Sequence, residues 1–476
     1  MNRLAGLLAA AFAFFGMAPA AASEAVDLLV RHAAIVDVAS GTVTADRAIA
    51  VRGDRILAVG ADAAIAARYS AARIVDASGA FAMPGLWDMH VHFGGGDTLV
   101  AENRALIPIY LAYGITTVRD CAGDLPQEVL RWRDETAAGT LLGPRIFTSG
   151  PKLEGLHPIW HGTIEVDSPA AVDAALDRLQ AMRVDFIKIT DNTLRPEIFL
   201  YAAQAAHRRG LRVSAHTPYA LTIEAAARAG LSAVEHLDYM IKAGSPREAE
   251  IAADYAAGRL TYAQAGARLR ESFDPAYAAA SYRRLAALGI AVTPTLNMTR
   301  IIAWLNEEDH SHDEGLALIG PGLRATYDWR VGRAAHWTPE EVASRRRDYQ
   351  LSLRILPMLR DAGIPILAGT DAGYLNSFNY PGQGLHDELA RYVEAGLTPA
   401  QALRTATITG PDFMGVAAHY GALAAGRTAD IVLLDANPLA DIAATRRIRT
   451  VVTRGRVLDR AALDSILAEA RAVASR

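Results

Sequence analysis

The pattern of hydrophobic positions divides the chain into two kinds of region. Near both ends, short apolar runs are separated by glycines, a pattern that predicts β-strands joined by turns. These runs are residues 28–38, 47–59, 73–83, 430–434 and 448–458. We therefore expect residues 23–84 and 426–476 to build one small composite β-sandwich domain, with the rest of the chain inserted into it. Two unrelated β-flaps are the alternative.

Residues 85–425 instead alternate strand-like runs with alanine-rich segments of helical period, such as 169–182, 197–209 and 222–229. The eight strand-like runs are 86–93, 115–120, 145–149, 186–190, 212–216, 233–237, 291–296 and 366–370. Eight strands with helical crossovers predict an α/β fold, the (β/α)8 TIM barrel. A doubly wound open sheet is the alternative, but it usually carries an early phosphate-binding glycine turn, which this pattern lacks.

Two histidines close the first strand of this barrel. Residues 84–92 have the sequence Pro-Gly-Leu-Trp-Asp-Met-His-Val-His. Side chains alternate along a strand, so His90 and His92 point to the same side and stand roughly 6–7 Å apart. This separation suits two imidazoles that share a metal ion. Taken alone, the pair could equally be a polar stripe on the strand.

Other strands of the predicted barrel carry polar residues too. Lys188 lies in the fourth strand, and His216, His236 and Asp371 lie at the ends of the fifth, sixth and eighth. Catalytic residues of TIM barrels lie at the carboxyl ends of the strands. Each residue alone has a structural explanation, such as a lysine whose amine reaches water. Together with the histidine pair, the set predicts a metal site.

The first 22 residues have the three regions of a secretory signal peptide. Arg3 supplies positive charge, residues 4–18 are apolar, and residues 18–22 are small, so we expect cleavage after Ala22. The apolar run is shorter than the ~20 residues that span a bilayer, which favours cleavage over an uncleaved anchor. We expect a mature protein that begins near Ser23, is periplasmic or secreted, and is not inserted in the membrane.

Charge and cysteine content exclude several classes of partner and chemistry. The net charge of −4 points neither to nucleic acid nor to an anionic membrane surface. Cys121 is the only cysteine, so no intrachain disulfide forms. It follows the second predicted strand without a partner base nearby, and a cysteine nucleophile is therefore not predicted.

At this point the chain resembles the metal-dependent amidohydrolase superfamily, and within it the imidazolonepropionase-like and Xaa-Pro dipeptidase-like branch. The motifs that carry the resemblance are PGLWDMHVH, GITTVRD, DFIKIT, VSAHT, AVEH, AVTPTL, ILAGTDAG and GALAAGRTADIVLLD. They cover nearly the whole mature chain in order. The resemblance is specific for the superfamily and much less so for the substrate. It implies the same fold, a barrel with a composite β-sandwich.

The resemblance also implies roles for the strand-end residues. His90, His92 and Asp371 would hold a first metal ion, usually zinc, and His216 and His236 a second. Lys188 would be carboxylated by carbon dioxide and bridge the two ions, because an ammonium between two cations is untenable. An unmodified Lys188 with a single metal ion is the alternative.

The implied reaction is hydrolysis of an amide C–N bond. Two divalent ions would activate a water and polarise a carbonyl, and Asp371 would carry a proton to the leaving amine. The expected small-molecule substrate is an Xaa-Pro-like dipeptide or an N-acyl amino acid. A cyclic-amide hydrolase of the imidazolonepropionase type, an esterase or lactonase on the same metals, and a catalytically silent binding protein remain alternatives.

Loops above the barrel are expected to set specificity. His157 and His161 lie in the loop after the third strand, and Tyr219 resembles a tyrosine that contacts substrate in the dipeptidase-like branch. We expect all three to bind substrate. The long connections 242–289 and 297–363 suit either a lid or a contact in a homo-oligomer.

Overall fold

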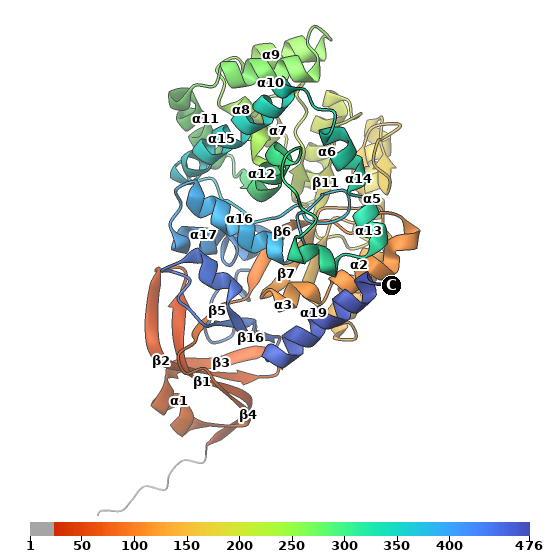
Figure 1. Cartoon of the computed structure of the whole chain (residues 1–476). Coiled ribbons are helices and arrows are strands. Elements are labelled where there is room, and N and C mark those ends of the chain that lie inside the picture. Colours follow the sequence, from red (N-terminus) through yellow and green to blue (C-terminus); the bar gives the residue numbers. More distant parts are fainter. Residues whose placement is uncertain (1–22) are drawn as a thin grey trace, which may run out of the picture.

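The computed structural model describes residues 23–476 (Figure 1). The signal peptide predicted at residues 1–22 lies outside the described residues. Among the helices of residues 23–476, none is long and apolar enough to cross a membrane.

Strands from both ends of the chain share one eight-stranded sheet, at the lower end of the molecule in Figure 1. They are β1 (Glu24–Asp37), β2 (Thr42–Arg52), β3 (Arg55–Ala61), β4 (Tyr69–Asp76), β5 (Phe81–Pro84), β15 (Ile431–Leu434), β16 (Ile448–Thr453) and β17 (Arg456–Leu458). The order is β17-β16-β15-β5-β1-β2-β3, with β4 beside β1. The two chain ends meet where β15 pairs antiparallel with β5.

One predicted strand, residues 47–59, is two strands in the structure. Gly53 has a φ of +56° between β2 and β3, which pair antiparallel as a hairpin. A tight hairpin turn needs this left-handed conformation, which glycine adopts without strain. Gly53 therefore divides the predicted run 47–59 into two strands.

The strands of residues 85–425, which we call the body, pair in parallel. They are β6 (Leu86–Val91), β7 (Ile115–Asp120), β8 (Arg145–Thr148), β9 (Lys152–Glu154), β10 (Thr163–Glu165), β11 (Ile187–Ile189), β12 (Val213–Ala215), β13 (Ala233–Glu235) and β14 (Ala291–Thr293). They form a six-stranded sheet, β10-β9-β11-β12-β13-β14, and a three-stranded sheet, β6-β7-β8. Single parallel bridges, Val91 with Ala372 and Val292 with Ile366, place the segment 366–372 between β6 and β14. The fold is thus α/β and TIM-barrel-like, and the predicted eighth strand consists of isolated bridges only.

Helices connect these strands and cover them (Figure 1). They are α1 (Asp62–Arg68), α2 (Val100–Leu106), α3 (Ile109–Ala112), α4 (Pro126–Ala138), α5 (Pro169–Ala181), α6 (Pro196–Arg208), α7 (Ile223–Arg228), α8 (Met240–Ala243), α9 (Glu248–Ala256), α10 (Tyr262–Glu271), α11 (Pro275–Ala287), α12 (Leu296–Trp304), α13 (Pro321–Ala325), α14 (Asp328–Ala334), α15 (Pro339–Asp361), α16 (Gln383–Glu394), α17 (Pro399–Thr405), α18 (Thr409–Met414) and α19 (Arg460–Ala474). The helices predicted at 169–182, 197–209 and 222–229 are α5, α6 and α7. Their boundaries follow from local chemistry: Ser168 and Thr222 cap α5 and α7, and Pro169 and Pro196 open α5 and α6.

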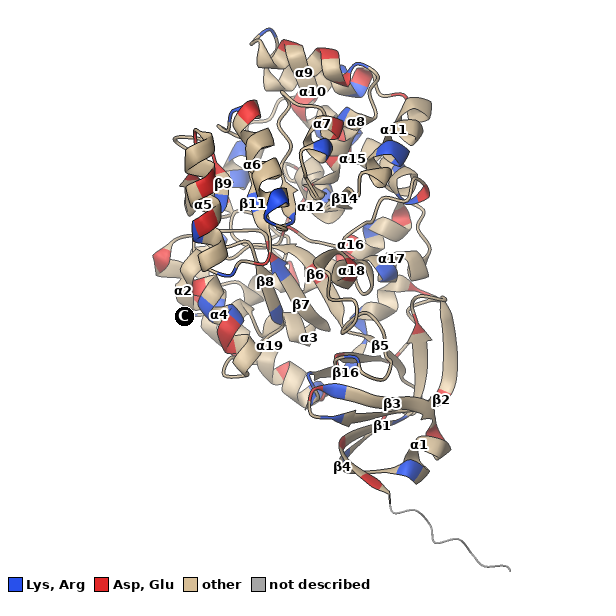
Figure 2. Ribbon diagram, turned by 180° about the vertical axis from the view of Figure 1, so that it is seen from behind, with Lys and Arg blue, Asp and Glu red and all other residues tan. Residues whose placement is uncertain are grey.

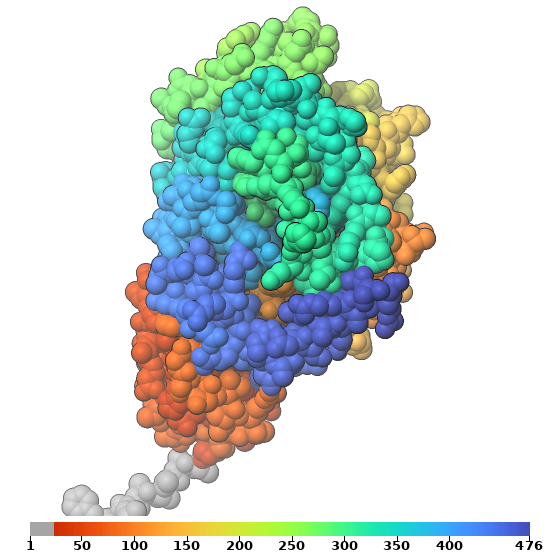
Figure 3. Space-filling model, in the orientation of Figure 1, coloured from red at the N-terminus to blue at the C-terminus, as the bar shows by residue number. Residues whose placement is uncertain are grey.

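The two long connections are helical and lie over one end of the body. The first contains α8 to α11 and the second α12 to α15. Figure 3 shows the second, coloured green to teal, on the outer surface, with α19 in dark blue below it. α19 packs against α2 and α3 of the body and takes no part in the sheet. Positively and negatively charged residues are interspersed along the outer helices (Figure 2).

Burial explains why the strands of the body are short and continuously apolar. Every residue of β6 and β7 is buried, as in parallel strands covered on both faces. The buried polar residues concentrate at the carboxyl ends of these strands, where His90, Lys188 and Asp371 have at most 9% of their surface exposed. A layer of buried polar side chains therefore covers the apolar core at the carboxyl ends of the body strands.

Candidate active site

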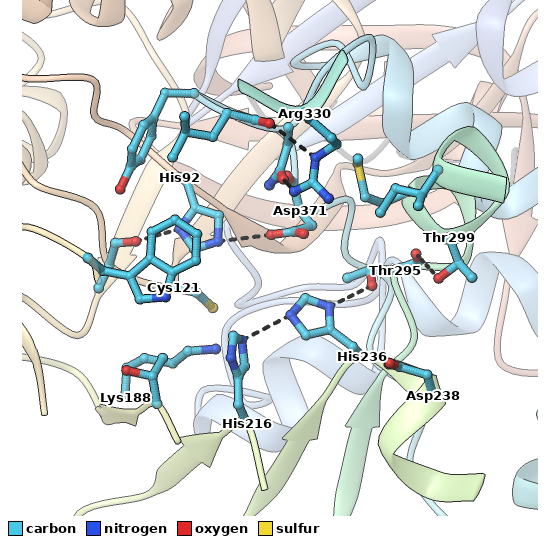
Figure 4. A pocket seen from close by; sticks show the side chains of 18 of the residues that line it. His92, Cys121, Lys188, His216, His236, Asp238, Thr295, Thr299, Arg330 and Asp371 are labelled. Carbon is cyan, nitrogen blue, oxygen red and sulfur yellow. Dashed lines mark hydrogen bonds and ion pairs between the residues drawn. The ribbon is translucent and has the colours of Figure 1, made fainter. Parts of the chain in front are cut away.

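Six side chains converge at the carboxyl end of the body strands. Figure 4 shows five of them, His92, Lys188, His216, His236 and Asp371, and the sixth is His90. The Nε2 atoms of His90 and His92 lie 3.1 Å apart, and those of His216 and His236 lie 3.0 Å apart. Asp371 Oδ1 is 2.9 Å from Nε2 of His92 and 3.3 Å from Nε2 of His90. Figure 4 shows the amine of Lys188 pointing toward His216. The structure therefore brings together all six residues that the sequence proposed as metal ligands.

Hydrogen bonds on the far side of the rings fix which nitrogen faces this centre. Nδ1 of His90 donates to Glu235 Oε2 at 2.7 Å, Nδ1 of His92 donates to the carbonyl of Ala122, and Nδ1 of His236 is 2.8 Å from the Thr295 hydroxyl. With Nδ1 so engaged, each Nε2 presents its lone pair to the centre. Nδ1 of His216 is 3.9 Å from Asp191, too far for a hydrogen bond.

Three of the four histidines, His90, His216 and His236, are held in their neutral form. Burial lowers the pKa of His90 to about 3, and it also lowers the pKa of His216 and of His236. A neutral imidazole is the form that binds a metal ion. For His90, burial and the hydrogen bond from Nδ1 to Glu235 therefore agree that Nε2 faces the centre as an acceptor.

Lys188 is the residue that most needs a further partner. Its side chain is 1% exposed, and its Nζ has no hydrogen-bond partner among the described residues. A buried, unpaired ammonium is strongly unfavourable. The donor set, four imidazoles and a carboxylate around this orphaned amine, fits divalent transition ions such as zinc, with Lys188 converted to an anion. Candidate metal-binding groups of the described residues include His90 with His236 and Asp371, whose donor atoms lie within 4.8 Å of one another.

The backbone is strained where it delivers these groups. Ala122, His236, Thr295 and Asp371 all have φ between 48° and 72°, although none is glycine. Such conformations cost roughly 1–3 kcal/mol each and persist where the surroundings enforce them, most often at active sites. Here they turn the chain sharply at the end of a strand, so that side chains depart from simple alternation.

A buried ion pair beneath the site was not foreseen from the sequence. Arg119 is fully buried and donates to Glu235 Oε1 at 2.7 Å, to Ser214 Oγ at 2.8 Å and to the carbonyl of Met89 at 2.6 Å. Burial opposes ionisation of Glu235, yet Arg119 and His90 hold the pKa of that carboxyl well below its usual range. Glu235 is therefore an anion that supports His90 from behind. Arg119 lies in the motif GITTVRD and Glu235 in the motif AVEH, so these two motifs could have pointed to the ion pair.

A cavity of about 330 Å³ opens above the metal-binding residues. One part of its wall is basic and carries Lys152, Arg330 and Arg345, and another part is acidic, with Asp238 and Asp348. Arg330, Arg345 and Asp348 come from the second long connection. That connection therefore contributes directly to the site.

The three expected substrate-binding residues do not line this cavity. The ring of Tyr219 packs instead against Tyr262, with ring centres 4.4 Å apart, and burial raises the pKa of its hydroxyl. His157 and His161 are exposed on the loop after β9. Resemblance to the dipeptidase-like branch suggested Tyr219, but its ring packs against Tyr255 and Tyr262 of the first long connection.

With this geometry established, comparison with known proteins defines the class. The model of the amidohydrolase family matches residues 81–458, and the chain belongs to that family. Members of the family are hydrolases that generally depend on metal ions. The chain is a member of the metal-dependent amidohydrolase superfamily, as the motifs indicated.

Individual relatives and solved structures are also similar to this chain. An ochratoxinase of Aspergillus niger is 26% identical over 415 residues, which are 76% of this chain and 71% of the relative. A crystal structure of a candidate prolidase from Bifidobacterium longum superposes with a TM-score of 0.66 at 26% identity, over 94% of this chain and 99% of the other. A Xaa-Pro dipeptidase with bound methionine has the same fold, with a TM-score of 0.66 at 19% identity over 91% of this chain and 99% of the other.

Proposed function

We propose that this protein is a binuclear metal-dependent hydrolase that cleaves the amide bond of a dipeptide or an N-acyl amino acid. The observation that carries the proposal is the pair of facing imidazole pairs around the orphaned amine of Lys188. His90, His92 and Asp371 would hold one ion, His216 and His236 the other, and carboxylated Lys188 would bridge them. Similarity to a prolidase-like structure and to ochratoxinase supports amide chemistry.

The residues of the chain have distinct tasks in this reaction. When bound, two divalent ions lower the pKa of a water molecule and polarise a carbonyl group. Asp371 takes a proton on its carboxylate and passes it to the leaving nitrogen. Glu235, Ala122 and Thr295 hold the imidazoles in the required tautomer. The cavity walls position the substrate over these groups.

Four further parts of the hypothesis concern the whole chain. We propose that the body is a closed (β/α)8 barrel and that the shared sheet of the two ends is a separate composite domain. The bridges at Val91 and Val292 and the β15–β5 pairing support these assignments. The composition of residues 1–22 supports export to the periplasm or medium. A homo-oligomer remains an expectation.

Metal analysis combined with an activity assay tests the proposal. We expect about two zinc ions per chain and hydrolysis of dipeptides or N-acyl amino acids that a chelator abolishes and zinc restores. Lys188→Ala should lose most activity and bind less metal, and a short carboxylic acid such as acetate should restore part of it by replacing the carbamate. His312→Ala, an exposed residue outside the site, serves as the matched control. Full hydrolysis by metal-free protein would refute the proposal.

A further inference from the structure

We propose that Arg330, Lys152 and Trp160 form a subsite for the amino-acid half of the substrate, which carries a free carboxylate and an aromatic side chain. This inference rests on the proposed function and specifies its substrate class. Arg330 and Lys152 would bind the carboxylate, and Trp160 would pack against the aromatic ring. All three line the cavity above the metal-binding residues.

Neither cation forms an ion pair with a carboxylate of the described residues, although acidic side chains lie nearby. Lys152 is 5% exposed, and its Nζ has neither a hydrogen bond nor an ion pair among residues 23–476. This Nζ lies over the Trp160 ring, 5.3 Å from the ring centre. Arg330 donates to the carbonyl of Leu375 at 3.2 Å and to Asn376 Oδ1 at 2.7 Å, both of which are uncharged. Burying unpaired cations is costly, and an anionic ligand would remove that cost. A carboxylate is the anion that matches a guanidinium fork.

The aromatic part of the subsite lies between the two cations. The ring centres of Trp160 and Trp329 are 6.1 Å apart at 62°, and the guanidinium of Arg330 is 5.5 Å from the Trp329 ring. Lys152, Trp160, Trp329 and Arg330 therefore follow one another in contact, two from the segment at β9 and two from α14. Trp329 holds the indole of Trp160 from outside, leaving Trp160 to face the cavity. Edge-to-face or stacked contact with this indole favours an aromatic side chain.

Exposed apolar residues gather on the same two segments. Five large hydrophobic residues are exposed in the described chain, and three of them, Leu156, Ile159 and Trp329, belong to the loop of Trp160 or to α14. Apolar surface concentrated beside a site commonly marks ligand contact. The concentration is what a subsite for a large apolar side chain requires.

The position of Arg330 identifies which half of the substrate it binds. Figure 4 shows Arg330 beside Asp371, the residue that would deliver a proton to the leaving nitrogen. In an N-acyl amino acid or dipeptide, that nitrogen, the carboxylate and the side chain share one carbon atom. A carboxylate held by Arg330 therefore belongs to the leaving amino acid, whose side chain then reaches toward Trp160.

Matched substrates test the subsite. N-acetyl-L-phenylalanine should exceed both its C-terminal amide and N-acetylglycine in kcat/KM by about tenfold or more. Arg330→Gln and Lys152→Met should raise KM for the acid and reduce the preference for acid over amide, while metal content stays unchanged. Trp160→Ala should reduce the preference for phenylalanine over glycine only. Arg333 stacks on Trp329 and does not line the cavity, so Arg333→Gln should leave both preferences intact.

A binding measurement separates this inference from the proposed function. Calorimetry should find L-phenylalanine bound at least about tenfold more tightly than its amide, and Arg330→Gln should abolish the difference. If amides are hydrolysed but acid and amide are equivalent in rate and binding, the subsite is wrong and the proposed function stands. If L-phenylalanine shows this selectivity but no amide is cleaved, the subsite stands and the proposed function fails.

Discussion

The buried carboxylate of Glu235 determines which nitrogen of His90 faces the metal-binding centre. Glutamine has the same shape, but its amide group can donate to Nδ1 and favour the opposite tautomer, and it removes the charge that Arg119 needs. We expect Glu235→Gln to weaken the first metal site by about 10–100-fold. Competition with a zinc chelator, and the absorption spectrum of the cobalt-loaded protein, would measure the change.

Thr295→Val is the matched comparison for Glu235→Gln, because it removes the hydroxyl beside His236 without removing a charge. It should weaken the second site, and by less than Glu235→Gln weakens the first. Unchanged release of both ions from Glu235→Gln would contradict an orienting role for this carboxylate.

Strand alternation and strand ends were enough to predict from the sequence which polar residues gather at the site, because both are local properties. Their roles as metal ligands come from the resemblance to the family and stay a prediction. Their supports were not predictable in this way. The positive φ of His236 breaks the alternation that would have separated it from Glu235. Arg330 lies far along the chain, and nothing in its local sequence indicates that α14 returns to the cavity. The interpretation of Tyr219 relied on the resemblance to the dipeptidase-like branch, whereas packing between helices determines where its side chain lies.

At the scale of elements, α12 depends on a carboxylate from another helix. It begins after Thr295, has no side-chain cap of its own, and its first backbone N–H groups, at Leu296 and Asn297, donate to Glu388 of α16 at 2.7 and 2.5 Å. Glu388→Ala would leave these buried groups unpaired, so we expect a loss of about 2–4 kcal/mol in the free energy of unfolding. Urea denaturation would measure it.

The effect should extend to the site, since Met298, Thr299 and Ile302 of α12 line the cavity. KM should therefore rise more than kcat falls. Glu394 is exposed at the end of α16, the helix that also carries Glu388. Glu394→Ala should change the free energy of unfolding by less than about 0.5 kcal/mol. Equal stabilities of the two variants would show that α12 does not need Glu388. A cap supplied by a residue far along the chain has no local signature, so the sequence could not predict this one.

At the scale of the whole molecule, β15 lies between two hydrophobic cores. Val432 and Leu434 pack into the main core of the body, whereas Leu433 packs into the separate core of the eight-stranded sheet. The same pattern of short apolar runs and glycines at both chain ends predicted that the two ends build one sheet domain. It could not predict that adjacent residues of one strand would serve different cores, since a fully apolar run has no alternation to interpret.

This arrangement predicts that the sheet and the body unfold together. Leu433 and Leu434 are both completely buried, and each substitution to alanine should cost about 2–5 kcal/mol. All six tryptophans, at positions 87, 132, 160, 304, 329 and 337, lie in the body, so their fluorescence reports that part alone. If β15 couples the two cores, Leu433→Ala will lower the fluorescence midpoint in urea as Leu434→Ala does, and far-ultraviolet circular dichroism will give the same midpoint. Ile74→Ala, at a position that is 59% exposed on β4, should move neither. A fluorescence transition unaffected by Leu433→Ala, beside an earlier loss of strand signal, would show that the sheet unfolds independently.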